Sequence, residues 1–198
     1  MSSVVALMSM SLDGFVADPD DGVDEVFDWY TSSGDVEIHT GGSDAMTFSM
    51  SAPSAEHVRT LTSRLGALIT GRRTFDVAHG WGGNHAWGPA FVLTHHVPDG
   101  WPRAGSTVHF VTDGIEIAVA QAKAAAEGKD VAVHGADTIQ QCLNAGLIDE
   151  ISVDVAAVLL GSGVRLFDHL EGTPAVLGTP TVTQGVGVTH LLYPVRTP

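Results

Sequence analysis

Short apolar segments alternate with helix-like segments through the middle of this chain, and this alternation limits the fold more than any other feature. The apolar segments are rich in β-branched residues, which is typical of strands buried on both faces. They predict strands at residues 4–8, 67–70, 91–94, 108–111, 131–134 and 150–160. Because parallel strands need crossover helices between them, the alternation predicts an α/β fold with a mostly parallel central sheet.

Two of the helices between these strands are predicted from their apolar residues. Ser54 is of a residue type that caps helices, and it is predicted to cap a helix whose apolar residues recur at helical spacing. Those residues are Val58, Leu61 and Leu65. A second helix follows the strand at 131–134, and its inner face carries Ile139, Leu143 and Leu147.

A third helix and the end of the chain have different signals. Asp113 and Glu116 have the D-x-x-E form of a capping box, which predicts a helix over residues 115–127. Two strand-like runs, 176–183 and 186–195, then follow each other with no helix between them. Consecutive strands of this kind predict an antiparallel edge at the C-terminal side of the sheet.

The chain has 198 residues and no internal repeat or low-complexity linker, so we expect a single domain over residues 1–198. Residues 11–53 are rich in Asp, Gly and Ser and have weak periodicity. A stretch of this length is typical of functional loops with short helices, one of which is predicted at residues 23–30.

The chain is strongly acidic, with a net charge of −14 from nine Lys and Arg against 23 Asp and Glu. Such a surface repels phosphate backbones and anionic lipids, so we expect neither nucleic acid nor membrane as a partner, and a small-molecule substrate instead. Cys142 is the only cysteine, and the first residues lack the basic region of a signal peptide. These features predict a cytoplasmic protein.

The turn Gly71-Arg72-Arg73-Thr74 follows the strand at 67–70 and opens a helix. Helix starts have unpaired N–H groups and a positive dipole end, so two arginines and a threonine hydroxyl there favour a phosphate site. The alternative is a solvated helix start with surface arginines.

Two other strand ends have polar or glycine-containing turns. His134 is followed by Gly135, Ala136, Asp137 and Thr138, where backbone amides could approach a pyrophosphate closely. An ordinary strand-to-helix turn capped by Asp137 or Thr138 explains the same residues. The third turn holds Thr94 and His95, which could donate hydrogen bonds to an adenosine phosphate; this signal is weak alone.

Other motifs are missing from the sequence. It has no Walker A motif, no G-x-G-x-x-G after a strand and no G-x-S-x-G. The ten histidines are scattered, without metal-ligand spacing, so we expect no metal site. Cys142 lies on the inner face of its predicted helix and is interpreted as a core residue.

Several motifs, in order, give the chain a family resemblance. They are residues 10–17 (MSLDGFVA), 71–75 (GRRTF), 133–138 (VHGADT), 146–151 (GLIDEI) and 158–163 (VLLGSG) with Leu166-Phe167. In this order the chain resembles dihydrofolate reductase-like proteins, in particular the reductase domain of bifunctional riboflavin-biosynthesis enzymes. The resemblance covers nearly the whole chain and implies the three-layer dihydrofolate reductase-like fold.

The resemblance also implies an NADPH-dependent reductase that forms a homodimer. Arg72 and Thr74, with Arg73 beside them and Gly71 at the turn, would hold the adenosine 2′-phosphate, with Thr94 and His95 nearby. Residues 135–138 would lie against the pyrophosphate, and Gly161 would close a loop near the same cleft. Ser11, Asp13 and Gly14 would lie beside the nicotinamide and the substrate.

The chain departs from the family pattern in two places. Many relatives have two glycines at the cofactor turn, whereas His134 precedes Gly135 here. The segment 18–53 is also expanded, and no arginine or lysine occurs before Arg59. The riboflavin-pathway reductases bind a ribose-phosphate substrate, so this lack of cations disfavours a phosphorylated substrate.

We therefore predict NADPH-dependent reduction of a small heterocyclic, carbonyl or imine substrate, of the 5-amino-6-(5-phosphoribosylamino)uracil reductase type. Asp13 is the first candidate for the catalytic carboxylate, although it could only shape its loop. Asp28 and Trp81 are candidate substrate residues, with a solvated helix face and a core position as their alternatives. A binding protein without turnover and a true dihydrofolate reductase are the rival functions.

Overall fold

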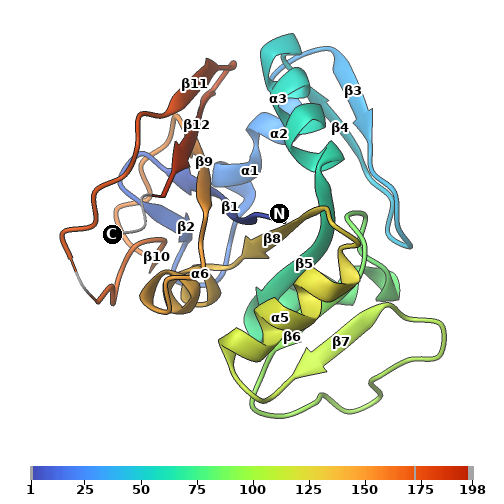
Figure 1. Cartoon of the computed structure of the whole chain (residues 1–198). Coiled ribbons are helices and arrows are strands. Elements are labelled where there is room, and N and C mark those ends of the chain that lie inside the picture. Colours follow the sequence, from blue (N-terminus) through green and yellow to red (C-terminus); the bar gives the residue numbers. More distant parts are fainter. Residues whose placement is uncertain (1, 172, 196–198) are drawn as a thin grey trace.

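The fold is built on an eight-stranded sheet in the order β11-β12-β9-β1-β8-β5-β6-β7 (Figure 1). The computed structural model describes residues 2–171 and 173–195; the two ends of the predicted domain, residue 1 and residues 196–198, lie outside this description. The strands of the sheet are β1 (Val4–Ser11), β5 (Leu65–Gly71), β6 (Ala90–Leu93), β7 (Val108–Val111), β8 (Asp130–His134), β9 (Glu150–Ala156), β11 (Thr181–Gln184) and β12 (Val188–Pro194).

The direction of the strands confirms the predicted sheet. β9, β1, β8, β5, β6 and β7 all pair in parallel. β12 pairs with β9 and with β11 in antiparallel orientation, so the last two strands form the antiparallel edge. The parallel strands therefore all end at one edge of the sheet, and this edge is where ligand sites form in such folds.

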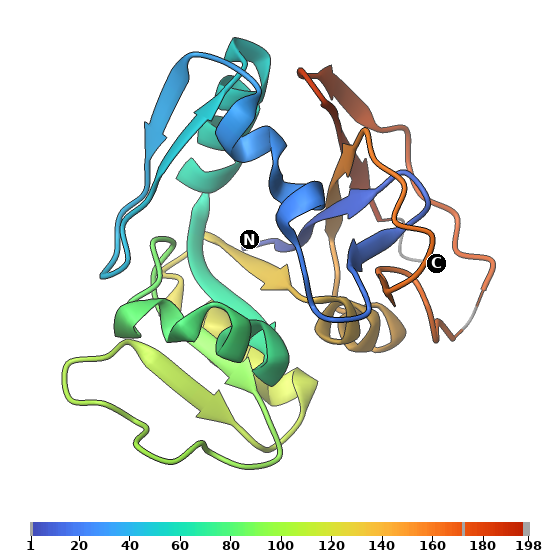
Figure 2. The same ribbon diagram turned by 180° about the vertical axis from the view of Figure 1, so that it is seen from behind.

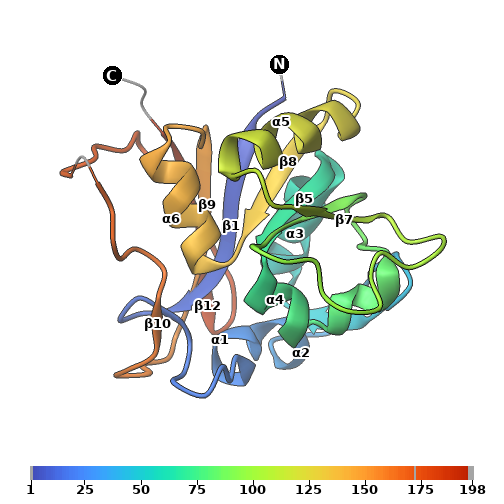
Figure 3. The ribbon, with the colours of Figure 1, turned by 90° about the horizontal axis from the view of Figure 1, so that it is seen from below.

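Helices cover both faces of the sheet, which confirms the three layers (Figure 3). α5 (Ile115–Ala125) and α6 (Ala136–Asn144) lie on one face, and α3 (Ala52–Ser63) and α4 (Arg72–Val77) lie on the other. The alternation of side chains along β1 serves both layers. Val4, Ala6 and Met8 join the core under α5 and α6, whereas Val5 and Leu7 join the opposite core.

The stretch of weak periodicity folds into more structure than its sequence predicts. The single predicted helix at 23–30 is two one-turn helices, α1 (Asp24–Phe27) and α2 (Trp29–Ser32). They are followed by an unpredicted hairpin of β3 (Val36–His39) and β4 (Thr47–Met50), which lies beside α3 (Figure 2). The remaining elements are β2 (Phe15–Ala17), paired with β10 (Val164–Arg165), and the short helix η1 (His79–Gly83).

The helix start predicted at Ser54 is wrong. Ser51 is the N-cap, because Pro53 lies in the first turn of α3 and needs no backbone N–H there. Ser54 is instead fully buried inside α3, and Leu65 has left the helix and begins β5.

The predicted capping box and the length of the strand at 150–160 are also wrong. Gly114 is the N-cap of α5, at φ +97°, and no side chain caps this helix end. β9 ends at Ala156, because the backbone then leaves the sheet and the carbonyl of Val158 accepts a hydrogen bond from the N–H of Leu12.

The helices in the described part of the chain are all too short or too polar to cross a membrane.

Candidate functional site

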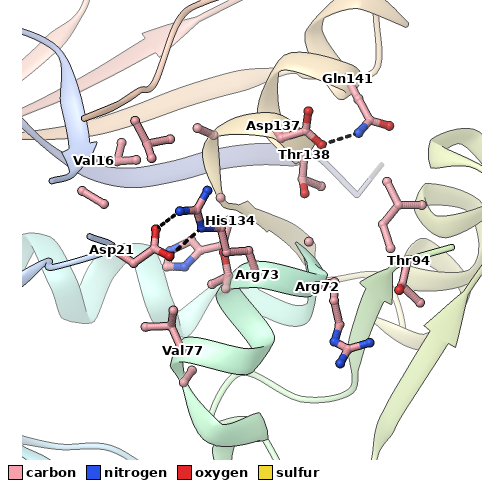
Figure 4. Close-up of a pocket in the computed structure, with 18 of the residues that line it drawn as sticks. Val16, Asp21, Arg72, Arg73, Val77, Thr94, His134, Asp137, Thr138 and Gln141 are labelled. Carbon is pink, nitrogen blue, oxygen red and sulfur yellow. Dashed lines mark hydrogen bonds and ion pairs between the residues drawn. The ribbon is translucent and has the colours of Figure 1, made fainter. Parts of the chain in front are cut away.

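A cleft of about 660 Å³ opens at the carboxyl ends of the parallel strands (Figure 4). β5 ends at Gly71 and β8 ends at His134, and the chain enters α4 and α6 directly after these two strands. Because β5 and β8 are neighbours in the sheet, both strand-to-helix turns face the same space. Apolar side chains complete its walls: Met8, Val16, Val23, Phe27, Val77 and Leu93.

The cleft brings together nearly all of the residues that the sequence nominates for the cofactor. Those that line it are Gly71, Arg72, Arg73, Thr74, Thr94, His95, Gly135, Ala136, Asp137 and Thr138. Gly161 is the exception; its backbone N–H donates a hydrogen bond of 2.7 Å to Asp13 Oδ2 instead. Three segments separated by many residues in the chain thus meet in one site.

Both glycine turns are packed against a threonine hydroxyl of the other turn. A Cβ built on Gly71 would lie 2.9 Å from Thr138 Oγ1, and one built on Gly135 would lie 2.8 Å from Thr74 Oγ1. Gly135 also has φ +88°, a left-handed conformation that favours glycine. The two turns therefore approach this closely only because each of them has a glycine at the contact.

Thr138 lines this cleft, and its hydroxyl is buried against Gly71. The residue is 1% exposed, and Thr138 Oγ1 has no hydrogen-bond partner among the described residues. It lies in the first turn of α6, where backbone N–H groups are also unpaired and the helix dipole is positive. An unpaired hydroxyl, free amides and a glycine without Cβ together form a cradle that fits an anionic group such as a pyrophosphate.

The two arginines of the cleft are held by carboxylates, and Figure 4 shows the pair of Arg73 with Asp21. Arg72 Nε donates to both oxygens of Asp76, at 2.8 and 2.9 Å, and Arg72 Nη1 donates to the carbonyl of His96. Arg73 Nε donates to Asp21 Oδ2 at 2.7 Å. Both arginine side chains are more than a third exposed, so solvent screens these pairs and an incoming phosphate can compete for the arginines. Sequence reasoning missed Asp21, since it lies 52 residues from its partner.

His134 carries an uncharged ring at the inner end of the cleft. Burial lowers the pKa of His134 to about 4, although the negative charge of Asp154 acts in the opposite direction. The ring packs edge-on against Trp87, with 5.3 Å between the ring centroids. Neutral His134 therefore adds no positive charge to the site at neutral pH.

Asp13 lies outside the lining of the cleft and holds a loop together. Its carboxylate accepts hydrogen bonds from the hydroxyl of Ser11 at 2.6 Å and from the N–H groups of Leu160 and Gly161. The Ser11 hydrogen bond, supported by these backbone bonds, holds the pKa of Asp13 below its ordinary value. Gly14 follows in the same turn at φ +91°. A carboxylate bound in this way shapes its loop and holds a proton poorly.

The other two substrate candidates lie apart from the cleft. Asp28 lines a second hollow, of about 590 Å³, between α1, α2 and the segment after β9, and it accepts a hydrogen bond from Ser32 Oγ at 2.6 Å. Trp81 belongs to the core around Phe75, at a ring distance of 5.9 Å. The structure does not bring either residue to the residues nominated for the cofactor.

Comparison with known proteins agrees with this architecture. The family model described as the RibD C-terminal domain matches residues 2–189. Comparison with curated protein sequences gives no match.

Three solved structures are similar over nearly the whole chain. A Shewanella sp. PV-4 protein described as a riboflavin biosynthesis protein is 24% identical with a TM-score of 0.66, and the match covers 100% of both chains. The Thermotoga maritima diaminohydroxyphosphoribosylaminopyrimidine deaminase/5-amino-6-(5-phosphoribosylamino)uracil reductase is 11% identical with a TM-score of 0.60; the match covers 98% of this chain and only 57% of that one. Enterococcus faecalis dihydrofolate reductase, solved with NADP(H) and RAB-propyl, is 11% identical with a TM-score of 0.60, over 98% of this chain and 97% of the reductase. These likenesses confirm the dihydrofolate reductase-like fold.

Proposed function

Because the chain belongs to the family of RibD C-terminal domains, we propose that it is a reductase that binds NADPH between the Gly71 and Gly135 turns. The observation that carries the proposal is the cleft itself, where two glycine turns, two arginines and an unpaired threonine hydroxyl converge. NADPH, when bound, supplies a hydride for a C=N or C=O carbon.

Each end of the cleft has groups for one part of the dinucleotide. Thr138 and the free N–H groups of α6 would bind the pyrophosphate, with Gly135 giving the backbone room to approach. Arg72 and Thr74 would bind the 2′-phosphate that distinguishes NADPH from NADH, because a guanidinium matches the geometry of phosphate oxygens. The apolar side chains of Met8, Val16 and Phe27 would exclude water from the reacting end.

The substrate is proposed to be a small heterocyclic, carbonyl or imine compound without a phosphate group. Among the described residues, the arginine side chains that line the cleft are those of Arg72 and Arg73, and both are assigned to the cofactor. Asp13 is proposed to position the loop beside the substrate through Leu160 and Gly161, because its ionised carboxylate is not suited to give up a proton. The homodimer implied by the family resemblance is part of the same proposal and can be checked by light scattering.

Titration of tryptophan fluorescence with NADPH and with NADH tests the cofactor assignment. We expect NADPH to bind more tightly, and Arg72→Ala to weaken NADPH binding by roughly 10- to 100-fold, the value of one or two charge-assisted hydrogen bonds, with little effect on NADH. Arg103→Ala is the matched control, since Arg103 lies over Trp101 away from the cleft. Equal losses for NADH and NADPH would remove Arg72 from the 2′-phosphate site.

A turnover assay on unphosphorylated heterocyclic, carbonyl and imine compounds then separates a reductase from a binding protein. Consumption of NADPH with one of these compounds supports the reductase. The neutral, bulky His134 beside Gly135 is the observation that favours the rival without turnover. Tight NADPH binding with no turnover on any of these substrate classes would favour that rival.

A further inference from the structure

A carboxylate is buried on the face of the sheet that α3 covers, away from the cofactor cleft. Asp154 of β9 is 2% exposed, and its neighbours on the adjacent strands are Ser9 of β1 and His190 of β12. The rings of His190 and His57 face this carboxylate.

Two histidines from different elements converge on this one carboxylate. Nδ1 of His190 lies 2.7 Å from Asp154 Oδ1, and Nε2 of His57, from α3, lies 3.5 Å from the same oxygen. The two imidazole rings stack, with 4.3 Å between centroids and 18° between planes. One nitrogen of each ring and a carboxylate oxygen thus lie within 4.8 Å of one another.

The surroundings fix His190 in this orientation. Its second nitrogen, Nε2, lies 2.9 Å from the buried hydroxyl of Ser54, and Ser54 is hydrogen-bonded to Ser51 in turn. Trp29 packs edge-on against the same ring at a centroid distance of 4.9 Å. A hydrogen bond to the far nitrogen of an imidazole is what orients metal-binding histidines in proteins.

His57 shows that the group lacks one component. His57 Nε2 is buried, yet within the described residues it has no hydrogen-bond partner, because its distance to Asp154 is too long. Buried imidazole nitrogens are normally paired. A cation held between this nitrogen, the buried carboxylate and the second imidazole would pair it.

We propose that His57, Asp154 and His190 bind one divalent transition-metal ion, with Zn²⁺ the best match. Two imidazoles and one carboxylate suit Zn²⁺, whereas Mg²⁺ and Ca²⁺ take oxygen ligands. With bonds of roughly 2.0–2.1 Å, the ligand atoms of a tetrahedral site lie about 3.3 Å apart. The contacts of 2.7 and 3.5 Å to Asp154 lie on either side of that value. Because the two rings are stacked, an ion fits once one of them rotates so that both nitrogens point toward it.

The site is independent of the proposed cofactor cleft. None of its three ligands lines that cleft. Three protein ligands leave the fourth position of a tetrahedral ion open, as in zinc sites that keep an open coordination position. The side chain of His57 is 12% exposed, so the cluster is not completely closed to the exterior.

Metal analysis of the full chain, purified without a polyhistidine tag, tests the proposal. After dialysis against Zn²⁺ and then against buffer, we expect about one equivalent of bound ion, and Co²⁺ in its place should give the visible absorption bands of a tetrahedral complex.

His57→Ala and Asp154→Asn should each weaken Zn²⁺ binding by more than about 100-fold, and Ser54→Ala by roughly 10- to 100-fold. The matched control is His169→Ala, an exposed histidine 3.8 Å from Asp168, which should bind Zn²⁺ as the wild type does.

Because Asp154→Asn and Ser54→Ala act inside the core, each variant is first checked by circular dichroism, and His57→Ala carries the test if the other two fail to fold. Absence of stoichiometric Zn²⁺ and Co²⁺ from the folded wild type would overturn the proposal. Wild-type affinity in folded His57→Ala would overturn it equally. NADPH titration on the same samples keeps this outcome separate from that of the proposed reductase.

Discussion

Gly135 lies directly against Thr74, so that a Cβ built on Gly135 would stand 2.8 Å from Thr74 Oγ1. This contact joins the turn after β8 to the turn after β5, which are the two halves of the proposed cofactor site. The Thr74 hydroxyl is proposed to bind the 2′-phosphate, and the backbone at Gly135 is proposed to approach the pyrophosphate. The position of this hydroxyl therefore depends on the position of the Gly135 backbone.

Gly135→Ala should damage both the fold and the cofactor site. The new methyl group collides with Thr74, and alanine is strained at φ +88°, so we expect a loss of about 1–3 kcal/mol in the free energy of unfolding. NADPH affinity should fall by at least about tenfold, since the two turns are pushed apart. Gly128→Ala is the matched control: Gly128 has φ +87° and open space around its Cβ position. Denaturant unfolding and NADPH titration of both variants should show a loss of affinity only for Gly135→Ala.

Thr138→Val should separate ligand binding from stability. A buried hydroxyl without a partner costs about 1–3 kcal/mol, so its replacement by a methyl group of similar shape should raise the free energy of unfolding by about 1 kcal/mol. The same change should weaken NADPH binding, because the hydroxyl is proposed to bind the pyrophosphate.

Thr70→Val provides the control for this pair. Thr70 Oγ1 is also buried without a partner among the described residues, but Thr70 does not line the cleft. Its replacement should therefore stabilise the protein and leave NADPH affinity unchanged. Equal affinities of the two valine variants would remove Thr138 from the site.

The sheet and the cofactor turns could be predicted because their signals are local. Apolar runs mark β1, β5 and β8 over a few residues each, and Gly71 and Gly135 follow directly after buried strands. The family motifs add the order of the elements. What brings the two turns together is the pairing of β5 with β8, and this pairing follows from the fold class rather than from either turn.

The β3–β4 hairpin and the histidine pair at Asp154 depend on packing between distant segments, which leaves little local pattern in the sequence. The strands of the hairpin β3–β4 have only four residues each and lie in a stretch rich in Asp, Gly and Ser, so the alternation along β3 is too short to stand out in the sequence. His190 is 36 residues from Asp154 and 136 from Ser54, and no spacing rule connects them. For the same reason, the expectation that scattered histidines hold no metal could not anticipate that two of them meet at one carboxylate.

Asp13→Asn should loosen the loop at Gly161. An amide side chain is a weaker acceptor than a carboxylate for the Leu160 and Gly161 N–H groups, so these amides should exchange hydrogen faster. In the wild type, the folded pKa of Asp13 is lowered, so its stabilising effect is present above the unfolded pKa of about 3.9 and is lost as the pH falls through the folded value. Hydrogen exchange followed by mass spectrometry checks both statements, and Asp168→Asn, on an exposed loop, serves as the control. Unchanged exchange at Gly161 in Asp13→Asn would contradict the loop-positioning role.

The stability of the protein should fall between neutral and mildly acidic pH because of His134. Burial lowers the pKa of His134 to about 4, whereas the unfolded chain has the ordinary value of about 6.5, so only the unfolded state takes up this proton at intermediate pH. The resulting stability is complete above the unfolded pKa and is lost progressively as the pH falls toward the folded one. At about pH 5 the loss amounts to about 2 kcal/mol for this side chain. His85, whose pKa burial lowers to about 3, adds a similar loss.

Replacement of His134 by glutamine keeps a polar side chain without a titrating group. Between about pH 7 and pH 5, the free energy of unfolding of His134→Gln, measured with denaturant, should therefore fall by about 2 kcal/mol less than that of the wild type. His95→Gln, at an exposed position of the cleft, should keep the wild-type pH dependence. If His134→Gln and the wild type lose the same stability over this range, the ring of His134 is not buried in its neutral form.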